Sequence, residues 1–432
     1  MSVSMRKKIL IRAPAFSRSG YGEQTRFALR ALRQREDILD LYLINVGWGQ
    51  TGCITKIDEE RRWMESLLAK TSMYMQQGGQ FDASLQVTIP NEWEPLAPVN
   101  IGFTAGIETT MVSPGWLGKG NEMDKIIVVS NHSKNVYETS VCQATNEATG
   151  EVIDDYRLQK PIIAVNYAVR KYDPEPMDDI ELEYDKNFIS VAQWGGRKNM
   201  QNTIKWFVEE FHDDEVGLVL KTNLANDNVQ DRKVTRERLE NFINEYPDRK
   251  CKIYLLHGTV SEGNLAWLYN HPKMIGLINI AHGEGFGLPL FEAACNGLPL
   301  VTIPWSGQVD FISAPNKNGK MRPMIAKVDY TLKNVQPEVV WNGVIEKESS
   351  WAFAAENSYK SRLRDVFKST ERYKSMAKRL QKYVLKNFSK ENQYAEFFEA
   401  FWPENTWGPI ENINEVMDLE GWLENLDIQE HE

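Results

Sequence analysis

Long hydrophobic runs are missing from this sequence, and so is any cysteine spacing that would indicate a disulfide framework or a redox pair. No apolar stretch approaches the ~20 residues needed to span a bilayer, so we expect no transmembrane segment. The four cysteines, Cys53, Cys142, Cys251 and Cys295, contain no C-x-x-C pair, and we expect reduced and mostly buried thiols. The basic segment 1–8 leads into no apolar secretory region, and we therefore expect a cytoplasmic protein.

A basic surface is also missing. No Lys or Arg lies between Trp402 and Glu432, where Asp and Glu are frequent, so most of the net charge of −10 belongs to an acidic tail. The rest of the chain is close to neutral, which does not indicate a strongly basic nucleic-acid binder but leaves local phosphate contacts open. With 42% apolar and 25% charged residues over 432 positions, the composition is that of a globular protein with two domains.

Strand-like and helix-like segments alternate along the chain, which predicts an α/β fold with parallel sheets. Residues 172–185 are rich in Pro, Asp and Glu and indicate a linker. We therefore predict two Rossmann-like, doubly wound domains that face each other across a cleft: residues 1–170 and 187–387, joined by 171–186. Ligands are expected at the carboxyl ends of the strands. The expected strands are 8–12, 41–46, 83–88, 100–104, 125–130, 161–165, 188–192, 217–221, 252–257, 276–281 and 298–303, and the expected helices include 23–33, 58–77, 361–387 and 390–401.

The segment 276–303 carries the strongest chemical signal. An apolar strand is followed by the glycine-rich loop 282–287, and a helix begins near Pro289 and ends before Gly297. Glycines let the backbone approach a ligand closely, and free N–H groups at a helix N-terminus favour an anion. The stretch Gly285-Phe286-Gly287-Leu288 is therefore expected to bind a diphosphate.

Two glutamates flank this expected anion site. Glu284 lies in the loop just ahead of the helix, and Glu292 lies about one turn into it, so both carboxylates can face one ligand. Carboxylates repel phosphate but accept hydrogen bonds well from sugar hydroxyls. A nucleotide-sugar has both an anionic part and hydroxyl-rich parts, and it is the ligand that these residues predict.

The residues of this segment resemble a known family. Glu284 to Glu292, written EGFGLPLFE, is similar to the E-x7-E motif of retaining GT-B glycosyltransferases, in particular glycosyltransferase family four. Similar pieces follow the family's order over about 400 residues. They are Ser19-Gly20-Tyr21-Gly22, Val128 to Lys134, Ala164 to Pro174, Gly195 to Asn199, His257-Gly258 and Leu265 to Tyr269.

The resemblance implies a role for several of these positions. Glu284 would contact the donor sugar and Glu292 the nucleotide ribose, and Gly20 and Gly22 would form a glycine loop at the donor. Lys198, helped by Arg197, would neutralise the diphosphate and stabilise the leaving group. Family members transfer with retention, without a protein nucleophile and without a metal, and no D-x-D metal motif stands out here. We thus expect no cofactor, and we expect the closing segment 388–432 to return to the first domain.

Two positions depart from the family pattern. Many relatives have Arg where this chain has Gln193, so that Arg197 would have to supply the second diphosphate cation. Many also carry a His on the acceptor side of the first domain, whereas residues 103–110 contain none and Glu108 is the nearest polar candidate.

The predicted activity is therefore that of a hexosyl- or pentosyltransferase that uses a nucleotide-sugar donor and a hydroxyl acceptor. The acceptor stays open among a small metabolite, a polysaccharide precursor, a protein side chain and a hydroxymethylated DNA base. The last option arises because the segment is similar to family-four enzymes of large bacteriophages, which would place the protein in the host cytoplasm. A catalytically silent nucleotide-sugar binding or scaffold protein is the alternative.

Several charged or polar side chains also have ordinary structural interpretations. Arg26, Arg30 and Arg33 fall on one helix face, which is expected to be a solvated face, with a phosphate-contacting patch as the alternative. His132 and His282 are expected to be structural. The acidic tail after Trp402 is expected to pack back on the body of the protein.

Overall fold

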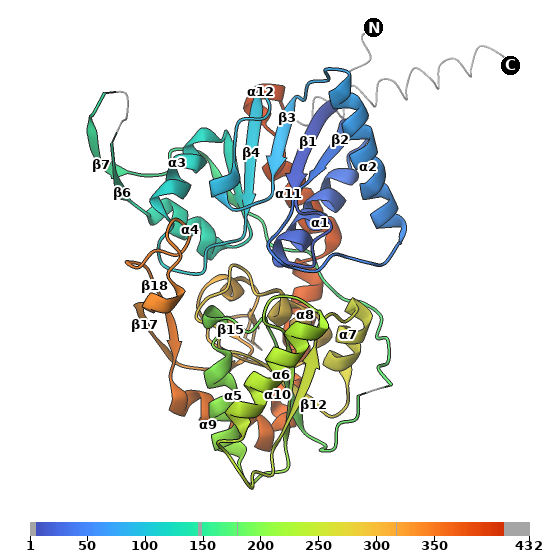
Figure 1. Cartoon of the computed structure of the whole chain (residues 1–432), viewed down its shortest axis with the longest axis vertical. Helices are drawn as coiled ribbons and strands as arrows, with labels where there is room; N and C mark the ends of the chain where they lie inside the picture. Colours follow the sequence, from blue (N-terminus) through green and yellow to red (C-terminus); the bar gives the residue numbers. More distant parts are fainter. Residues whose placement is uncertain (1–5, 146–148, 179, 317, 410–432) are drawn as a thin grey trace, which may run out of the picture.

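The computed structural model describes residues 6–145, 149–178, 180–316 and 318–409. Each half of the chain builds a six-stranded sheet in which every pair of neighbouring strands is parallel. The strand orders are β2-β1-β3-β4-β5-β8 in the first sheet and β11-β10-β9-β12-β13-β16 in the second. Helices lie against both sheets, and the two α/β layers are stacked along the long axis of the molecule (Figure 1).

Within the described residues, the first half contains eight strands, of which six form the sheet and two form a hairpin. Its strands are β1 (Lys7–Ala13), β2 (Leu39–Asn45), β3 (Ala83–Gln86), β4 (Val99–Thr104), β5 (Lys125–Val128), β6 (Cys142–Thr145), β7 (Val152–Tyr156) and β8 (Ile162–Ala164). Its helices are α1 (Gly20–Arg33), α2 (Glu59–Gln76), the short 3-10 turn η1 (Pro90–Glu92), α3 (Pro114–Glu122) and α4 (Asn131–Thr139). The hairpin β6–β7 projects from the side of this half (Figure 1).

The second half repeats the pattern and adds two further hairpins. Its strands are β9 (Asn187–Val191), β10 (Gly217–Thr222), β11 (Lys252–His257), β12 (Met274–Asn279), β13 (Leu300–Thr302), β14 (Ser313–Pro315), β15 (Met321–Pro323), β16 (Ala326–Lys327), β17 (Tyr330–Asn334) and β18 (Ser350–Ala354). Its helices are α5 (Met200–Phe211), α6 (Val229–Ile243), α7 (Glu262–Asn270), α8 (Leu288–Asn296), α9 (Glu356–Lys368) and α10 (Thr370–Asn387), with 3-10 turns η2 (Gly196–Lys198), η3 (Gly307–Asp310) and η4 (Pro337–Val339).

The closing helices α11 (Lys390–Phe401) and α12 (Glu404–Trp407) lie against the first half. Phe397 of α11 packs on Phe27 of α1 with ring centroids 5.4 Å apart. The Lys125 ammonium of β5 donates to the carbonyl oxygens of Ala400 and Trp402. The C-terminal helix α11 thus completes the core of the N-terminal half, while the acidic tail from residue 410 lies outside the described residues.

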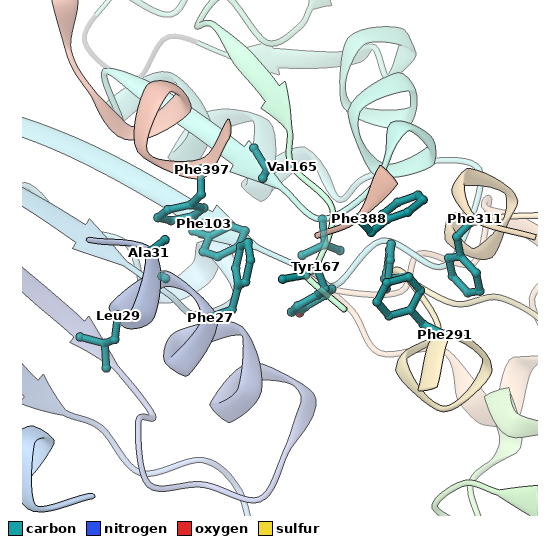
Figure 2. Packing of buried hydrophobic residues seen from close by; sticks show 14 of the residues in the cluster. Phe27, Leu29, Ala31, Phe103, Val165, Tyr167, Phe291, Phe311, Phe388 and Phe397 are labelled. Atoms are coloured by element: carbon teal, nitrogen blue, oxygen red, sulfur yellow. The ribbon is translucent and has the colours of Figure 1, made fainter. Parts of the chain in front are cut away.

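One hydrophobic cluster runs through both halves (Figure 2). Phe27 packs on Tyr167 at 5.5 Å between ring centroids, Tyr167 on Phe286 at 5.1 Å, and Phe286 on Phe291 at 5.1 Å. Tyr167 lies in the crossover that leaves β8, so a chain of buried rings joins α1 to α8 through the crossover. Dense packing of this kind fixes how the loops of the two halves meet.

The stretch 361–387, predicted as one helix, is two helices that break at Ser369. The prediction was wrong because the two helices cover different parts of the core. Leu363 and Val366 of α9 pack in the cluster of the second domain alone, whereas Leu380 and Val384 of α10 pack in the cluster shared by both halves.

Cys251 and Cys295 are buried and Cys142 is half-buried, whereas Cys53 is exposed, and all four are free thiols. In the part of the chain that the structure describes, no helix combines the length and the apolar character that crossing a membrane requires.

Candidate active site

Glu284 lies at the centre of a buried cluster of charges. The Lys198 ammonium donates to both of its carboxylate oxygens, at 2.6 and 2.7 Å, and the Arg197 guanidinium lies 3.3 Å from Oε2. The Asn279 amide donates to Oε1 at 3.0 Å. Burial alone would raise the pKa of Glu284, but Lys198 and Arg197 lower it to about 2. Glu284 is therefore a carboxylate held between two cations.

The backbone around Glu284 is fixed from the next loop of the sheet. The Ser306 hydroxyl accepts from the Glu284 N–H at 2.9 Å, and the Gly307 N–H donates to the Glu284 carbonyl at 2.9 Å. Asn279 is the last residue of β12, so the carboxylate and its amide partner both lie at the carboxyl edge of the sheet. This is the edge at which open α/β sheets bind ligands.

Lys198 and Arg197 reach Glu284 from the loop after the neighbouring strand β9. The loop ends at Asn199, whose positive φ of 52° turns the chain into α5 and whose amide donates to Ile280 O at 3.2 Å. The His282 N–H also donates to the Arg197 carbonyl at 2.8 Å. Burial lowers the pKa of Lys198, and the neighbouring Arg197 lowers it further. The two loops are thus joined by their backbones as well as by the ion pair.

Glu108 brings the first half of the chain to the same cluster. Its Oε1 lies 3.5 Å from Nη2 of Arg197, so Arg197 lies between Glu108 and Glu284. The predicted catalytic residues Glu284, Lys198, Arg197 and Glu108 are therefore close together, although they come from three separate loops.

The loops of the two halves are in direct contact here, and glycine makes the contact possible. A Cβ atom at Gly283 would overlap the backbone oxygen of Glu108, and one at Gly285 would overlap that of Ala105. Any side chain at these positions would push the two loops apart.

The N-terminus of α8 follows immediately. Gly287 has a φ of 95° and precedes Leu288, the first residue of the helix, and the helix ends at Gly297 with a φ of 73°, as the sequence predicts. The Phe286 ring is buried in the shared core, against Phe311 among others. Only backbone groups of the stretch 285–288 are therefore suited to hold an anion.

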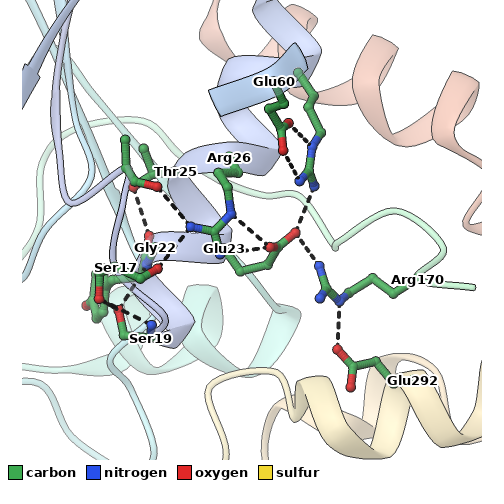
Figure 3. A network of polar contacts seen from close by, with 12 residues as sticks. Ser17, Ser19, Gly22, Glu23, Thr25, Arg26, Glu60, Arg170 and Glu292 are labelled. Atoms are coloured by element: carbon green, nitrogen blue, oxygen red, sulfur yellow. Dashed lines mark hydrogen bonds and ion pairs between the residues drawn. The ribbon is translucent and has the colours of Figure 1, made fainter. Parts of the chain in front are cut away.

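Glu292 belongs to a different network (Figure 3). Its Oε1 accepts from Nε of Arg170 at 2.7 Å, and Arg170 also contacts Glu23 of α1. Among the described residues no hydrogen bond or ion pair joins Glu284 to Glu292, so the two glutamates have separate partners. Burial raises the pKa of Glu292, and Arg170 opposes that rise.

Gly20 and Gly22 lie in the first turn of α1, capped by the Ser19 hydroxyl, which accepts from the Gly22 N–H at 3.1 Å. A Cβ atom at Gly22 would overlap the Ser17 carbonyl, whereas Gly20 has open space around it. Tyr21 links this turn to the Glu108 loop, because its hydroxyl lies 2.7 Å from Thr104 Oγ1 and accepts from the Ala105 N–H at 3.4 Å.

The arginines of α1 do not form the expected solvated face. Arg26 is 7% exposed, bonds to Glu23 at 3.1 Å and donates to the carbonyls of Ala15 and Ser17. Arg30 bonds to Glu23 and Glu60, and Arg33 lies 3.5 Å from Glu59. That prediction was wrong because helical spacing shows a shared face but cannot show the acidic partners that α2 supplies.

The two histidines named in the sequence make structural contacts. The His282 ring stacks on Trp351 at a centroid distance of 5.0 Å and bonds through Nδ1 to Ala352 O. His132 lies edge-on to Trp305, and its Nε2 is buried with no hydrogen-bond partner in the described ranges. Gln193 donates to the Leu224 carbonyl at 2.6 Å.

Sequence reasoning missed Arg170, Lys221, Asn279 and Ser306. Lys221 is the last residue but one of β10, its ammonium has no hydrogen bond or ion pair to any residue that the structure describes, and burial lowers its pKa. A charged residue at the carboxyl end of an apolar strand was the available signal for Lys221. Within the described residues, no group of three or more His, Cys, Asp and Glu is arranged to hold a metal ion.

Solved structures of low sequence identity share this fold. The chain superimposes on a sucrose-phosphate synthase from Thermosynechococcus elongatus with a TM-score of 0.57, 13% identity, and coverage of 92% of this chain and 98% of the other. A UDP-forming α,α-trehalose-phosphate synthase from Burkholderia xenovorans gives a TM-score of 0.55, 10% identity, and the same coverage of 92% and 98%. The chain has the GT-B fold.

A third structure with the GT-B fold, trehalose-6-phosphate from E. coli bound with UDP-2-fluoro glucose, gives a TM-score of 0.52 at 10% identity and covers 91% of this chain and 98% of the other. No protein-family model and no curated protein significantly matches the sequence. At these identities the comparisons establish the GT-B architecture, which hosts the charge cluster at the carboxyl edge of its second sheet.

Proposed function

We propose that this protein is a metal-independent, retaining glycosyltransferase that moves a sugar from a nucleotide-sugar to a hydroxyl acceptor. One observation carries the proposal: Lys198 and Arg197 from the loop after β9 meet Glu284 from the loop that leads from β12 into α8, at the carboxyl ends of both strands. Two cations and helix N–H groups suit a diphosphate, and a buried carboxylate suits sugar hydroxyls.

In this reaction the bond between the anomeric carbon and the donor phosphate oxygen breaks, and the nucleoside diphosphate leaves with the electron pair. The acceptor hydroxyl forms the new bond on the same face of the sugar, and its proton passes to the departing phosphate. Lys198 and Arg197 would stabilise the charge that develops on the leaving group. Lys198 must then transfer part of its interaction from Glu284 to the phosphate.

The neighbouring structures support a nucleoside diphosphate donor. One of them is described as UDP-forming and another is bound with UDP-2-fluoro glucose. In the proposed assignment Glu284 binds hydroxyls of the donor sugar, Glu292 binds the ribose, and Gly20 and Gly22 line the donor from the first domain. The transferred sugar is a hexose or a pentose.

The acceptor side is proposed to lie at Glu108. This carboxylate comes from the first domain and contacts the cluster through Arg197 alone among its described ionic partners. An acceptor hydroxyl near Glu108 would approach the donor from the first domain.

A hydroxymethylated DNA base is one acceptor that fits such a transfer. Because Arg26, Arg30 and Arg33 are paired with glutamates, contacts to the DNA backbone would have to come from other residues. Binding of duplex DNA at low salt that weakens steeply as salt rises would support this acceptor, and no binding at low salt would exclude it.

A silent nucleotide-sugar binding protein is the second candidate. It is favoured by Gln193, which engages the Leu224 carbonyl and leaves the diphosphate site with one cation fewer than in many relatives. Incubation with UDP-, GDP- and ADP-sugars separates the two functions. Release of the nucleoside diphosphate supports the enzyme, whereas binding without release across candidate acceptors supports the silent protein.

A further inference from the structure

Arg170 is a buried side chain to which the proposed reaction assigns no role. It lies in the crossover after β8, and its backbone neighbour Val169 is tied to Phe388 O by an N–H bond of 2.8 Å. The side chain is 10% exposed. Burying a guanidinium is costly unless acidic partners surround it.

The partners of Arg170 come from the two different domains (Figure 3). Glu23 is in the first turn of α1, beside the glycine loop, and Glu292 is in α8, beside the diphosphate-binding stretch. Arg170 thus connects two segments to which the proposed function gives donor contacts. Within the described residues, the only other ion pair between the domains is that of Arg197 with Glu108.

The two glutamates share Arg170 unequally. Glu23 has three arginines around it, Arg26, Arg30 and Arg170, and although burial would raise its pKa, these cations lower it to about 2. For Glu292, Arg170 is the one ion-pair partner among the described side chains, and the pKa of Glu292 is raised. Loss of Arg170 would therefore disturb the orientation of Glu292 far more than the orientation of Glu23.

The bond to Arg170 uses one oxygen of Glu292. Nε of Arg170 donates to Oε1, and no described cation pairs with Oε2. The Tyr269 hydroxyl lies beside this carboxylate as a hydrogen-bond neighbour, and the charge of the Lys221 ammonium acts on it. A carboxylate held by one oxygen can present the other to a ligand hydroxyl with a fixed direction.

We propose that Arg170 is a positioning residue for donor binding: it holds Glu292 through Oε1, so that Oε2 accepts from a ribose hydroxyl, and it ties this contact to α1 through Glu23. The inference rests on the proposed function, because it presumes a nucleoside diphosphate donor. A guanidinium suits this role because its planar fork can serve two carboxylates at once, which an ammonium does less well.

Calorimetry first identifies which of UDP, GDP and ADP binds most tightly. The test then compares the affinity of that nucleotide with the affinity of its 2′,3′-dideoxy counterpart. A hydrogen bond to a charged acceptor increases affinity roughly 10- to 100-fold. We therefore expect wild type to bind the ribonucleotide more tightly than the dideoxy nucleotide by that factor. Arg170→Gln is expected to reduce the preference to about twofold while the dideoxy affinity changes little. Glu292→Gln should reduce the ribose preference to the same extent. The double variant Arg170→Gln/Glu292→Gln should lose no more of that preference than either single variant.

Arg30→Gln is the matched control, because Arg30 also bonds to Glu23 and does not touch Glu292. It should keep the wild-type preference. If Arg170→Gln does not fold by circular dichroism, Arg170→Lys decides the matter and should lower the preference at least threefold.

A folded Arg170→Gln or Arg170→Lys protein that keeps the full ribose preference would overturn the inference. So would a wild-type protein that binds a nucleoside diphosphate without ribose preference, although the proposed function would stand. If wild type binds none of the three nucleotides, the proposed function itself fails.

Discussion

The Lys198 ammonium and the Glu284 carboxylate form a buried ion pair in which both carboxylate oxygens accept from one nitrogen, at 2.6 and 2.7 Å. The lysine comes from the loop after β9 and the glutamate from the loop after β12, and these strands are neighbours in the second sheet. The pair therefore prearranges a cation and a hydrogen-bond acceptor for two parts of one donor. Because neither side chain is free to turn to solvent, little reorganisation is needed when a ligand replaces part of the pairing.

Lys198→Ala should lower the rate of nucleotide release from the donor roughly 100-fold or more, since removal of one preorganised electrostatic contact has an effect of that size. Lys205→Ala is the matched control, because Lys205 lies on α5, is about half exposed and pairs only with Glu209 in the described structure. Steady-state release assays on both variants check the prediction. Equal rates for the Lys198 variant and wild type would remove Lys198 from the leaving-group site.

Gly285→Ala should separate the two domains at the site. The added methyl group would overlap the Ala105 carbonyl, so we expect a destabilisation of about 2 kcal/mol and a loss of activity. Gly118→Ala in α3 is the control, because a Cβ atom there meets nothing within 4 Å. Thermal unfolding and small-angle scattering measure the two effects, and a Gly285 variant as stable and as compact as wild type would contradict the described loop contact.

Glu23 should make the fold sensitive to strong acid. Its pKa in the fold is about 2, against about 4.5 in the unfolded chain, so its stabilising contribution is complete above pH 4.5 and is lost as the pH falls towards 2. Glu23→Gln should therefore flatten the fall of the unfolding free energy between these pH values. The exposed Glu122→Gln change should leave that slope intact. Denaturant unfolding across this window checks the sign.

His132 should make the unfolding free energy depend on pH in a higher range than Glu23 does. Burial lowers its pKa from about 6.5 to about 4, against the opposing effect of a bond with the Thr109 backbone, so the ring is neutral in the fold. Between pH 6.5 and 4 the unfolded chain binds a proton at this ring and the folded chain does not. The unfolding free energy therefore falls by up to about 3 kcal/mol as the pH is lowered through this range. His132→Asn should be less acid-sensitive there than wild type, whereas an unchanged slope would show that the ring is not buried as described.

Much of the fold could be predicted because its parallel strands are buried on both faces and appear in the sequence as short apolar runs. The stretch 276–281 and the helix bounded by Pro289 and Gly297 are examples, and β12 and α8 lie where those signals indicate. The hairpin β6–β7 was missed because its half-exposed strands lack such runs, and the hairpin β17–β18 was missed because its strand β17 is mostly exposed. The break at Ser369 has no proline or glycine and reflects tertiary packing alone.

The candidate site was only partly predictable for a related reason. Local spacing places Glu284 and the start of α8, and the family resemblance adds Lys198 and Arg197. Neither the spacing nor the resemblance can show that Glu108 approaches Arg197 from a loop 89 positions earlier. Nor can they show that Arg170 rather than Glu284 is the neighbour of Glu292. Those contacts depend on how the two domains meet, which the shared aromatic core determines.

The most direct measurement is the release of nucleoside diphosphate from a panel of UDP-, GDP- and ADP-sugars, with a chelator present, for wild type, Glu284→Gln and Lys198→Ala. The proposed function predicts release by wild type from at least one donor in the presence of the chelator, and a loss of roughly 100-fold or more in both variants. Binding of a donor by wild type with no release in any condition, or release that both variants retain in full, would contradict it.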